Sequence, residues 1–118
     1  MDISELVGKT LSDVKVGETE ILFETTDGER FKMYHEQDCC EGVSVEDIVG
    51  DVKSLIGNPI LVAEERTNHN DPKKDGDYAD DSCTWTFYEI ATVKGSVTIR
   101  WYGSSNGYYS ESVSIARI

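Results

Sequence analysis

The sequence predicts an α+β fold, in which antiparallel β-hairpins form a sheet and one amphipathic helix, at about residues 45–57, packs on it. Three observations favour this fold. Segments rich in β-branched and aromatic residues recur along the chain with period-two alternation, an Asp-Gly pair separates two of them, and one segment carries apolar residues at helical spacing. A chain of 118 residues without an internal boundary predicts a single domain, residues 1–118.

The first part of the chain predicts three strands. Residues 9–16 and 19–25 are rich in strand-forming residues and are separated by a glycine-containing turn. Asp27-Gly28 follows and is typical of a tight hairpin turn, because its central positions require positive φ. Residues 30–35 then form the third strand, and a short helical turn is expected at residues 3–7.

The prediction of a helix is based on residues suited to its two ends and on apolar residues at helical spacing between them. Ser44 is suited to cap the first turn, Gly57 to end the helix, and Pro59 prevents its continuation. Between them, the apolar residues that recur at helical spacing are Ile48, Val49, Val52, Leu55 and Ile56.

The second half of the chain predicts more strands around one loop. Residues 60–66 read as a strand, and residues 68–82 predict a mobile acidic loop because they are polar and contain Asn, Asp, Gly and Pro. Three further strands are expected at 83–93, 96–102 and 108–115. In the segment 96–102, residues Val97, Ile99 and Trp101 alternate with polar or charged residues and should face the core.

The charge of the chain limits its partners. Eleven basic and 23 acidic residues give a net charge of −12, which repels nucleic acids and anionic membranes. We therefore expect no direct nucleic-acid binding and no membrane partner. The acidic surface serves solubility or attracts a basic protein. The first residues lack a basic region followed by an apolar stretch, so we expect no signal peptide and a location in the cytoplasm of the cell that makes the protein.

No motif predicts a cofactor, a metal site or a catalytic centre. The acidic loop that begins at Asp71 departs from a calcium loop at Lys73 and Ser82. His35 with the three cysteines has the right atoms for zinc, but Cys39 and Cys40 are adjacent and cannot easily turn toward one ion. We expect free thiols and no metal. Six carboxylates and no cation lie in residues 36–51, which disfavours a reactive thiolate there.

The C-terminal region predicts a ligand site. Residues 94–118 contain three basic residues and one acidic residue, in contrast to the chain as a whole. An arginine among aromatic rings suits a planar ligand that carries a phosphate. The predicted ligand-binding residues are Arg100, Trp101, Tyr102, Tyr108 and Tyr109. The alternative is that this hairpin packs into the core and that Arg100 only pairs with an acidic neighbour such as Glu89.

Several segments of the chain carry a resemblance, namely residues 34–41, 46–48, 50–51, 59–65, 85–88, 98–103 and 105–110. They resemble a family of small acidic proteins, encoded mostly by phages and prophages and catalogued as a domain of unknown function. The resemblance covers nearly the whole chain and implies a phage accessory protein that works inside a bacterial host cell. It carries over no established activity.

Two functional hypotheses follow from these observations. The first is a counter-defence binding protein that sequesters a small nucleotide-derived immune signal. The alternative is an acidic DNA mimic that inhibits a basic host defence protein. A small hydrolase that uses the carboxylate cluster is a third and less supported class. The sequence leaves the oligomeric state open, a homo-oligomer included.

Overall fold

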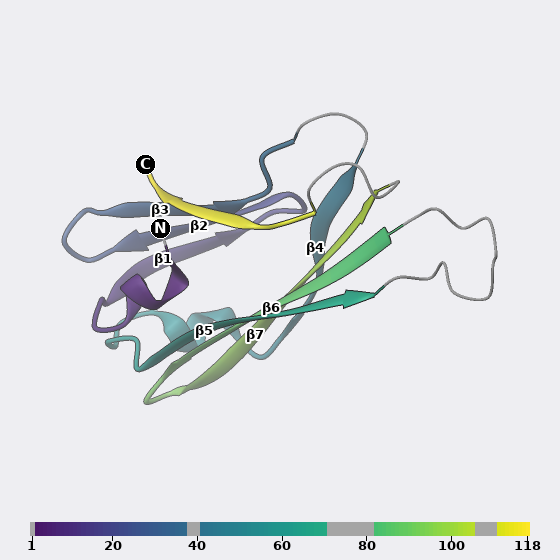
Figure 1. The fold of residues 1–118 in the computed structure, drawn as a ribbon. Coiled ribbons are helices and arrows are strands. Elements are labelled where there is room, and N and C mark those ends of the chain that lie inside the picture. The colour runs from purple at the N-terminus through teal and green to yellow at the C-terminus, as the bar shows by residue number, and fades with distance from the viewer. Residues whose placement is uncertain (1, 38–40, 71–81, 106–110) are drawn as a thin grey trace.

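Two antiparallel sheets face each other across the core in the computed structural model, which describes residues 2–37, 41–70, 82–105 and 111–118 (Figure 1). One sheet has the strand order β1-β2-β3-β8 and the other has the order β4-β7-β6-β5. The first sheet contains β1 (Leu11–Val16), β2 (Glu20–Thr25), β3 (Arg30–Tyr34) and β8 (Ser114–Arg117). The second contains β4 (Gly42–Val49), β5 (Val62–Asn70), β6 (Ser82–Thr92) and β7 (Gly95–Ser105). Two short 3-10 turns, η1 (Ile3–Leu6) and η2 (Val52–Leu55), complete the described elements.

Alternation along the strands determines which side chains enter the core. In β2 and β3, Ile21, Phe23, Phe31 and Met33 are buried, while the residues between them are more exposed. In β7, every second residue from Val97 to Ser105 is buried, as the period-two pattern predicts. The predicted inward face of Val97, Ile99 and Trp101 is therefore confirmed, as is the short helical turn near the N-terminus.

The predicted α+β class is wrong, because the described residues form strands and 3-10 turns and no α-helix. Residues that were expected in the helix 45–57 instead form most of β4, then a bend at Gly50, then η2. Ser44 does not cap a helix: it pairs across the sheet with Tyr102 of β7. Asp51 caps η2 instead, since its side chain accepts a hydrogen bond from the backbone N–H of Lys53.

Local preference and long-range pairing together explain this difference. β4 is rich in the β-branched residues valine and isoleucine, which lose side-chain freedom in a helix and pack well on a pleated surface. Gly50 would have stood in the helix interior, where glycine costs about 1 kcal/mol relative to alanine. A short apolar run suits either state, and pairing with β7 over the whole length of β4 decides for the strand.

The predicted loop 68–82 begins and ends inside a hairpin. Asn68, His69 and Asn70 belong to β5, and Ser82 begins β6; for example, Asn70 pairs with Cys83. Residues 71–81 lie outside the described residues, and so does the segment compared above with a calcium loop, apart from Ser82.

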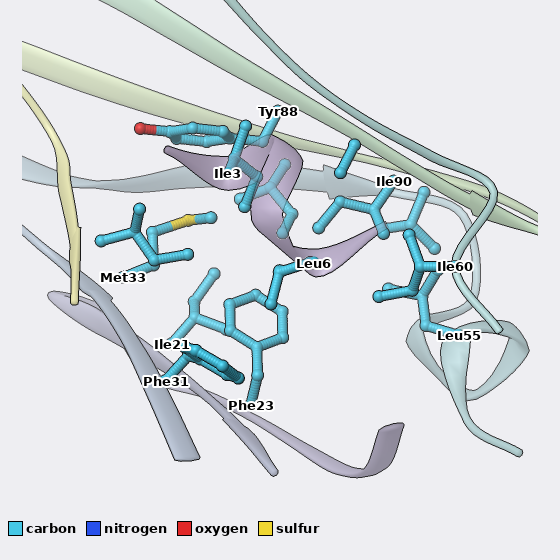
Figure 2. Close-up of a cluster of buried hydrophobic side chains, with 14 of the residues drawn as sticks. Ile3, Leu6, Ile21, Phe23, Phe31, Met33, Leu55, Ile60, Tyr88 and Ile90 are labelled. Carbon is cyan, nitrogen blue, oxygen red and sulfur yellow. The ribbon is translucent and has the colours of Figure 1, made fainter. Parts of the chain in front are cut away.

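The core receives side chains from both sheets and from both 3-10 turns (Figure 2). Figure 2 shows Leu6 of η1 and Leu55 of η2 pointing into the same interior as Phe23 and Ile90. The indole N–H of Trp101 donates a hydrogen bond to Sδ of Met33, 3.2 Å away, which joins the two sheets through their largest buried ring. None of the described helical turns is long and apolar enough to cross a membrane.

We predict that the bend at Gly50 tolerates no side chain. Gly50 has φ of +108°, and a Cβ there would lie 2.6 Å from the carbonyl oxygen of Ser96. Gly57 has φ of +90° with open space around it, so a substitution there strains the backbone without a steric clash and serves as the control. Gly57→Ala should lower the free energy of unfolding by about 1–2 kcal/mol, the cost of a left-handed residue. Gly50→Ala should cost about 2 kcal/mol more because of the steric clash. Urea denaturation measures both, and equal losses would show that β7 does not approach Gly50 as described.

Candidate functional site

The side of the sheet β4-β7-β6-β5 that is turned away from the core carries an unusual set of side chains. We call it the outer face. Cross-strand pairing arranges its central residues in rows, and no described helix or strand packs on them. The outer-face residues used below are Asp47 from β4, Glu64 and Arg66 from β5, Trp85, Phe87 and Glu89 from β6, and Thr98, Arg100 and Tyr102 from β7.

Arg100 lies at the centre of this face. Its guanidinium carbon lies 5.2 Å from the centroid of the Trp85 ring, which is the geometry of a cation–π contact. Its Nη2 lies 3.6 Å from Oδ2 of Asp47, beyond hydrogen-bonding distance, and its side chain is 39% exposed. Its Nε is buried without a hydrogen-bond partner among the described residues. The Trp85 ring therefore fixes the position of the guanidinium, while Asp47 neutralises its positive charge only weakly.

A β-bulge in β4 places Asp47 beside Arg100. Val45 pairs with Trp101 and Asp47 with Arg100, so one extra residue is accommodated between them. The bulge directs the Asp47 side chain to the outer face, whereas regular pairing would have placed Glu46 there. Asp47 also accepts a hydrogen bond from the backbone N–H of Ile48, at 2.8 Å, which holds its carboxylate near the strand.

Trp85 and Tyr102 form an aromatic pair on the same face. They are directly opposite each other in β6 and β7, with ring centroids 4.6 Å apart and an angle of 56° between the ring planes. Both are partly buried, and Phe87 lies in the next row, opposite Arg100. Aromatic rings that remain partly exposed beside an arginine, on a face that no described element covers, are typical of an interaction surface.

The structure separates the predicted ligand-binding residues. Arg100 and Tyr102 both lie on the outer face, where Arg100 contacts Trp85 and lies near Asp47, not Glu89. Trp101 is fully buried in the core and offers no surface to a ligand. Tyr108 and Tyr109 lie outside the described residues.

Sequence reasoning missed Trp85, Phe87 and Arg66. Trp85 and Phe87 are apolar like Tyr88 and Ile90 of the same predicted strand, 83–93, but the side chains alternate, and it is Tyr88 and Ile90 that are buried. The position of these side chains could have been found from the tight turn at residues 93–94, which fixes the register of the β6–β7 hairpin. Once Thr92 pairs with Gly95, the register places Trp85 opposite Tyr102 and Phe87 opposite Arg100.

A second polar cluster closes one end of the sandwich. His35 and Glu41 have nearly no exposed side-chain surface, and Nε2 of His35 lies 2.7 Å from Oε2 of Glu41. Nδ1 of His35 donates a hydrogen bond to the carbonyl oxygen of Ser112, at 2.6 Å. Because both ring nitrogens are engaged, the imidazole holds the segments before β4 and before β8 together. This engagement leaves no ring nitrogen free to act as a catalytic base or a metal ligand.

The carboxylate of Glu111 is also held by hydrogen bonds within the protein. Its two carboxylate oxygens accept hydrogen bonds from the hydroxyl of Thr84, at 2.7 Å, and from the hydroxyl of Ser105. All three residues are buried. A buried carboxylate that is satisfied by hydroxyl donors stabilises the fold, and removal of either donor would leave it under-bonded.

Of the residues considered for zinc or for hydrolysis, those that the structure describes are not brought together. Within the described ranges, no three His, Cys, Asp or Glu side chains are placed to share a metal ion. Glu41 is buried against His35, whereas Asp47 lies on the outer face. Cys83 lies on β6, and Cys39 and Cys40 lie outside the described residues.

The outer side of the other sheet carries a depression of about 180 Å³. Its charged lining residues are Asp13, Lys15, Glu24 and Arg30. Nε of Arg30 is only 3.1 Å from Glu24. Because charges of both signs alternate there and one arginine is already paired, the depression shows no preference for an ion of either sign.

Two pKa shifts have clear local causes. Burial, followed by the hydrogen bond that the Tyr88 hydroxyl donates to Oε2 of Glu65 at 2.6 Å, raises the pKa of Tyr88 well above its usual value. The hydroxyl of Thr25 donates to the carboxylate of Asp27 and lowers the pKa of Asp27. Both groups serve the fold: Tyr88 links β6 to β5, and Asp27 stabilises the β2–β3 turn.

Comparison with known families gives one match. A model of a family described as a domain of unknown function (DUF7448) matches residues 4–115, so the chain belongs to this family. Neither the curated proteins nor the solved structures include a match. The match agrees with the family resemblance noted in the sequence and does not indicate a ligand.

We predict that ionisation of Tyr88 in the unfolded chain makes the protein less stable above pH 10. The folded pKa is raised, so the folded state keeps a proton that the unfolded state loses. Stability is fully present below the unfolded pKa and falls as pH rises through it. Between pH 9 and pH 11, the free energy of unfolding of the parent should fall by about 1.4 kcal/mol more than that of Tyr88→Phe. Urea denaturation at both pH values measures the difference, and equal falls would contradict this environment for Tyr88.

Proposed function

We propose that this DUF7448 protein is a non-enzymatic binding protein that holds a small nucleotide-derived ligand on the outer face. One observation carries the proposal. The guanidinium of Arg100 is held against the ring of Trp85 beside Tyr102, on a sheet face that no described element covers. An arginine fixed by a tryptophan is pre-organised, so less side-chain freedom is lost when an anion binds.

The chemistry of these groups suits a phosphate attached to a planar ring. A guanidinium presents parallel N–H donors that match two phosphate oxygens, and its hydrogen bonds to an anion are stronger than those between neutral groups. Stacking of a base on an aromatic side chain contributes about 1–3 kcal/mol. A β-sheet that displays aromatic rings is a known platform for bases. The Asp47 contact is long and exposed and contributes roughly 0–1 kcal/mol, so a phosphate can replace it.

The charge of the whole chain argues for a small ligand and against a polymer. A nucleic acid that extended beyond Arg100 would meet a protein of net charge −12. Its phosphates would then be repelled by the surface around the outer face, whereas a mononucleotide or dinucleotide stays within it.

For the biological role, we propose counter-defence by a phage-encoded protein in the bacterial cytoplasm, through sequestration of a nucleotide immune signal. The family resemblance supports this context, and the outer face supports the ligand class. The acidic DNA mimic has less support. The exposed carboxylates Glu18, Asp51 and Glu64 come from the β1–β2 turn, the N-cap of η2 and β5, so these three do not form a continuous row on one element.

We predict that adenosine 5′-monophosphate quenches the fluorescence of Trp85, with a dissociation constant on the order of 0.1–1 mM, as expected for one stacked ring and one charged contact. Trp101, the other tryptophan, is buried and should not respond. Arg100→Gln should weaken binding about tenfold or more while the melting temperature stays within a few degrees of the parent.

The matched control for this experiment is Arg30→Gln. Arg30 is an exposed arginine on the other sheet, so the control removes the same charge at a distance from the site. If Arg100→Gln binds as well as the parent, or if both variants weaken binding equally, the outer face is not the ligand site.

A further inference from the structure

We infer that Arg66 is a second anion contact of the outer face, and that the ligand is a nucleotide with two separate phosphate groups. This inference rests on the proposed function and deepens it. Arg66 and Arg100 both pair with Phe87, from opposite sides, in the register of the sheet. The three residues therefore form one row across β5, β6 and β7, which we call the arginine row.

The spacing of the arginine row follows from sheet geometry. Neighbouring strands lie about 4.8 Å apart, so the backbones at Arg66 and Arg100 are separated by about 10 Å. The apolar ring of Phe87 lies between them. The guanidinium of Arg100 lies against Trp85 with Nη2 toward Asp47 of β4, the strand on the side of β7 away from Arg66. Two phosphates therefore fit the two arginines better than one phosphate does.

Arg66 is available for such a contact. Its side chain is exposed, and no carboxylate of the described residues lies within ion-pair distance of it. Its sequence neighbour Glu65 points to the opposite side of the sheet, where it accepts the hydrogen bond from Tyr88. Among the described residues, Arg66 is thus an arginine without an ion-pair partner, one strand away from the Trp85–Tyr102 pair, and its charge is available to an anion.

The rows on either side of the arginine row orient the ligand. On one side, Glu64 pairs with Glu89, and these carboxylates repel an anion. On the other side, Trp85 pairs with Tyr102. The base should therefore stack over the aromatic pair while its phosphates lie along the arginine row. A nucleotide with phosphates on two positions of its ribose, or a dinucleotide, has this distribution of groups.

The test compares two probes on two proteins. Adenosine 5′-monophosphate carries one phosphate, and adenosine 3′,5′-bisphosphate carries two that are separated by the ribose. The parent should bind the bisphosphate at least tenfold more tightly than the monophosphate, as measured by quenching of tryptophan fluorescence at fixed ionic strength. Arg66→Gln should reduce this preference to threefold or less and should change monophosphate binding by less than threefold. Arg30→Gln should keep the full preference.

Each outcome decides a separate point. The role of Arg66 is overturned if the parent binds the monophosphate but shows no preference for the bisphosphate. It is also overturned if the preference survives Arg66→Gln. In both cases the proposed function stands. Absence of quenching by either probe at millimolar concentration overturns the proposed function and this inference together. Because Arg66 is exposed on an edge strand, the variant should melt within a few degrees of the parent, which confirms that it is folded.

Discussion

The register of the β6–β7 hairpin is the constraint on which both the core and the outer face depend. The two strands pair from Ser82 with Ser105 to Thr92 with Gly95, without interruption. Since side chains alternate across a strand, this single register sends Tyr88, Ile99 and Trp101 inward. The same register sends Trp85, Phe87, Arg100 and Tyr102 outward. A shift by one residue would exchange the two sets, bury an arginine and expose the tryptophan that joins the sheets, so stability of the core also preserves the proposed site.

The neighbouring strands complete the outer face and set its charge. β4 contributes Asp47 through its bulge, and β5 contributes Arg66 at the edge of the sheet. Arg100 contacts the ring of Trp85, and its ion pair with Asp47 is long and weak. Among the described residues, positive charge on this face is confined to Arg66 and Arg100, because Asp47, Glu64 and Glu89 lie beside them. A small anion can stay on the two arginines, whereas a longer one would meet these carboxylates. The buried polar groups at the end of the sandwich, by contrast, have their hydrogen bonds within the protein and need no ligand.

Sequence reasoning predicted the β1–β2, β2–β3 and β6–β7 hairpins, but neither the division into two sheets nor the place of the last strand, because β8 pairs with β3 and not with β7. Short-range signals were sufficient for the Asp27-Gly28 turn and for the alternation of residues 96–102, because both depend on neighbouring residues. The apolar spacing of residues 45–57 fits a helix, and only pairing with the distant β7 makes the part up to Val49 a strand. The difference between Trp101 and Trp85 has the same origin. Alternation along residues 96–102 is sufficient to place Trp101 in the core, but only the register between β6 and β7 brings Trp85, distant from Arg100 in the sequence, beside it on the outer face.

The central claim is that the outer face of the β4-β7-β6-β5 sheet, and no other surface, binds the nucleotide. Backbone and indole NMR signals recorded during titration with adenosine 3′,5′-bisphosphate test it most directly. The account predicts that the largest shifts occur at the indole of Trp85 and at the amides of Phe87, Arg100 and Tyr102, while the indole of Trp101 and the amides of β2 and β3 stay in place. Shifts centred on the other sheet, or spread evenly over both, would contradict it.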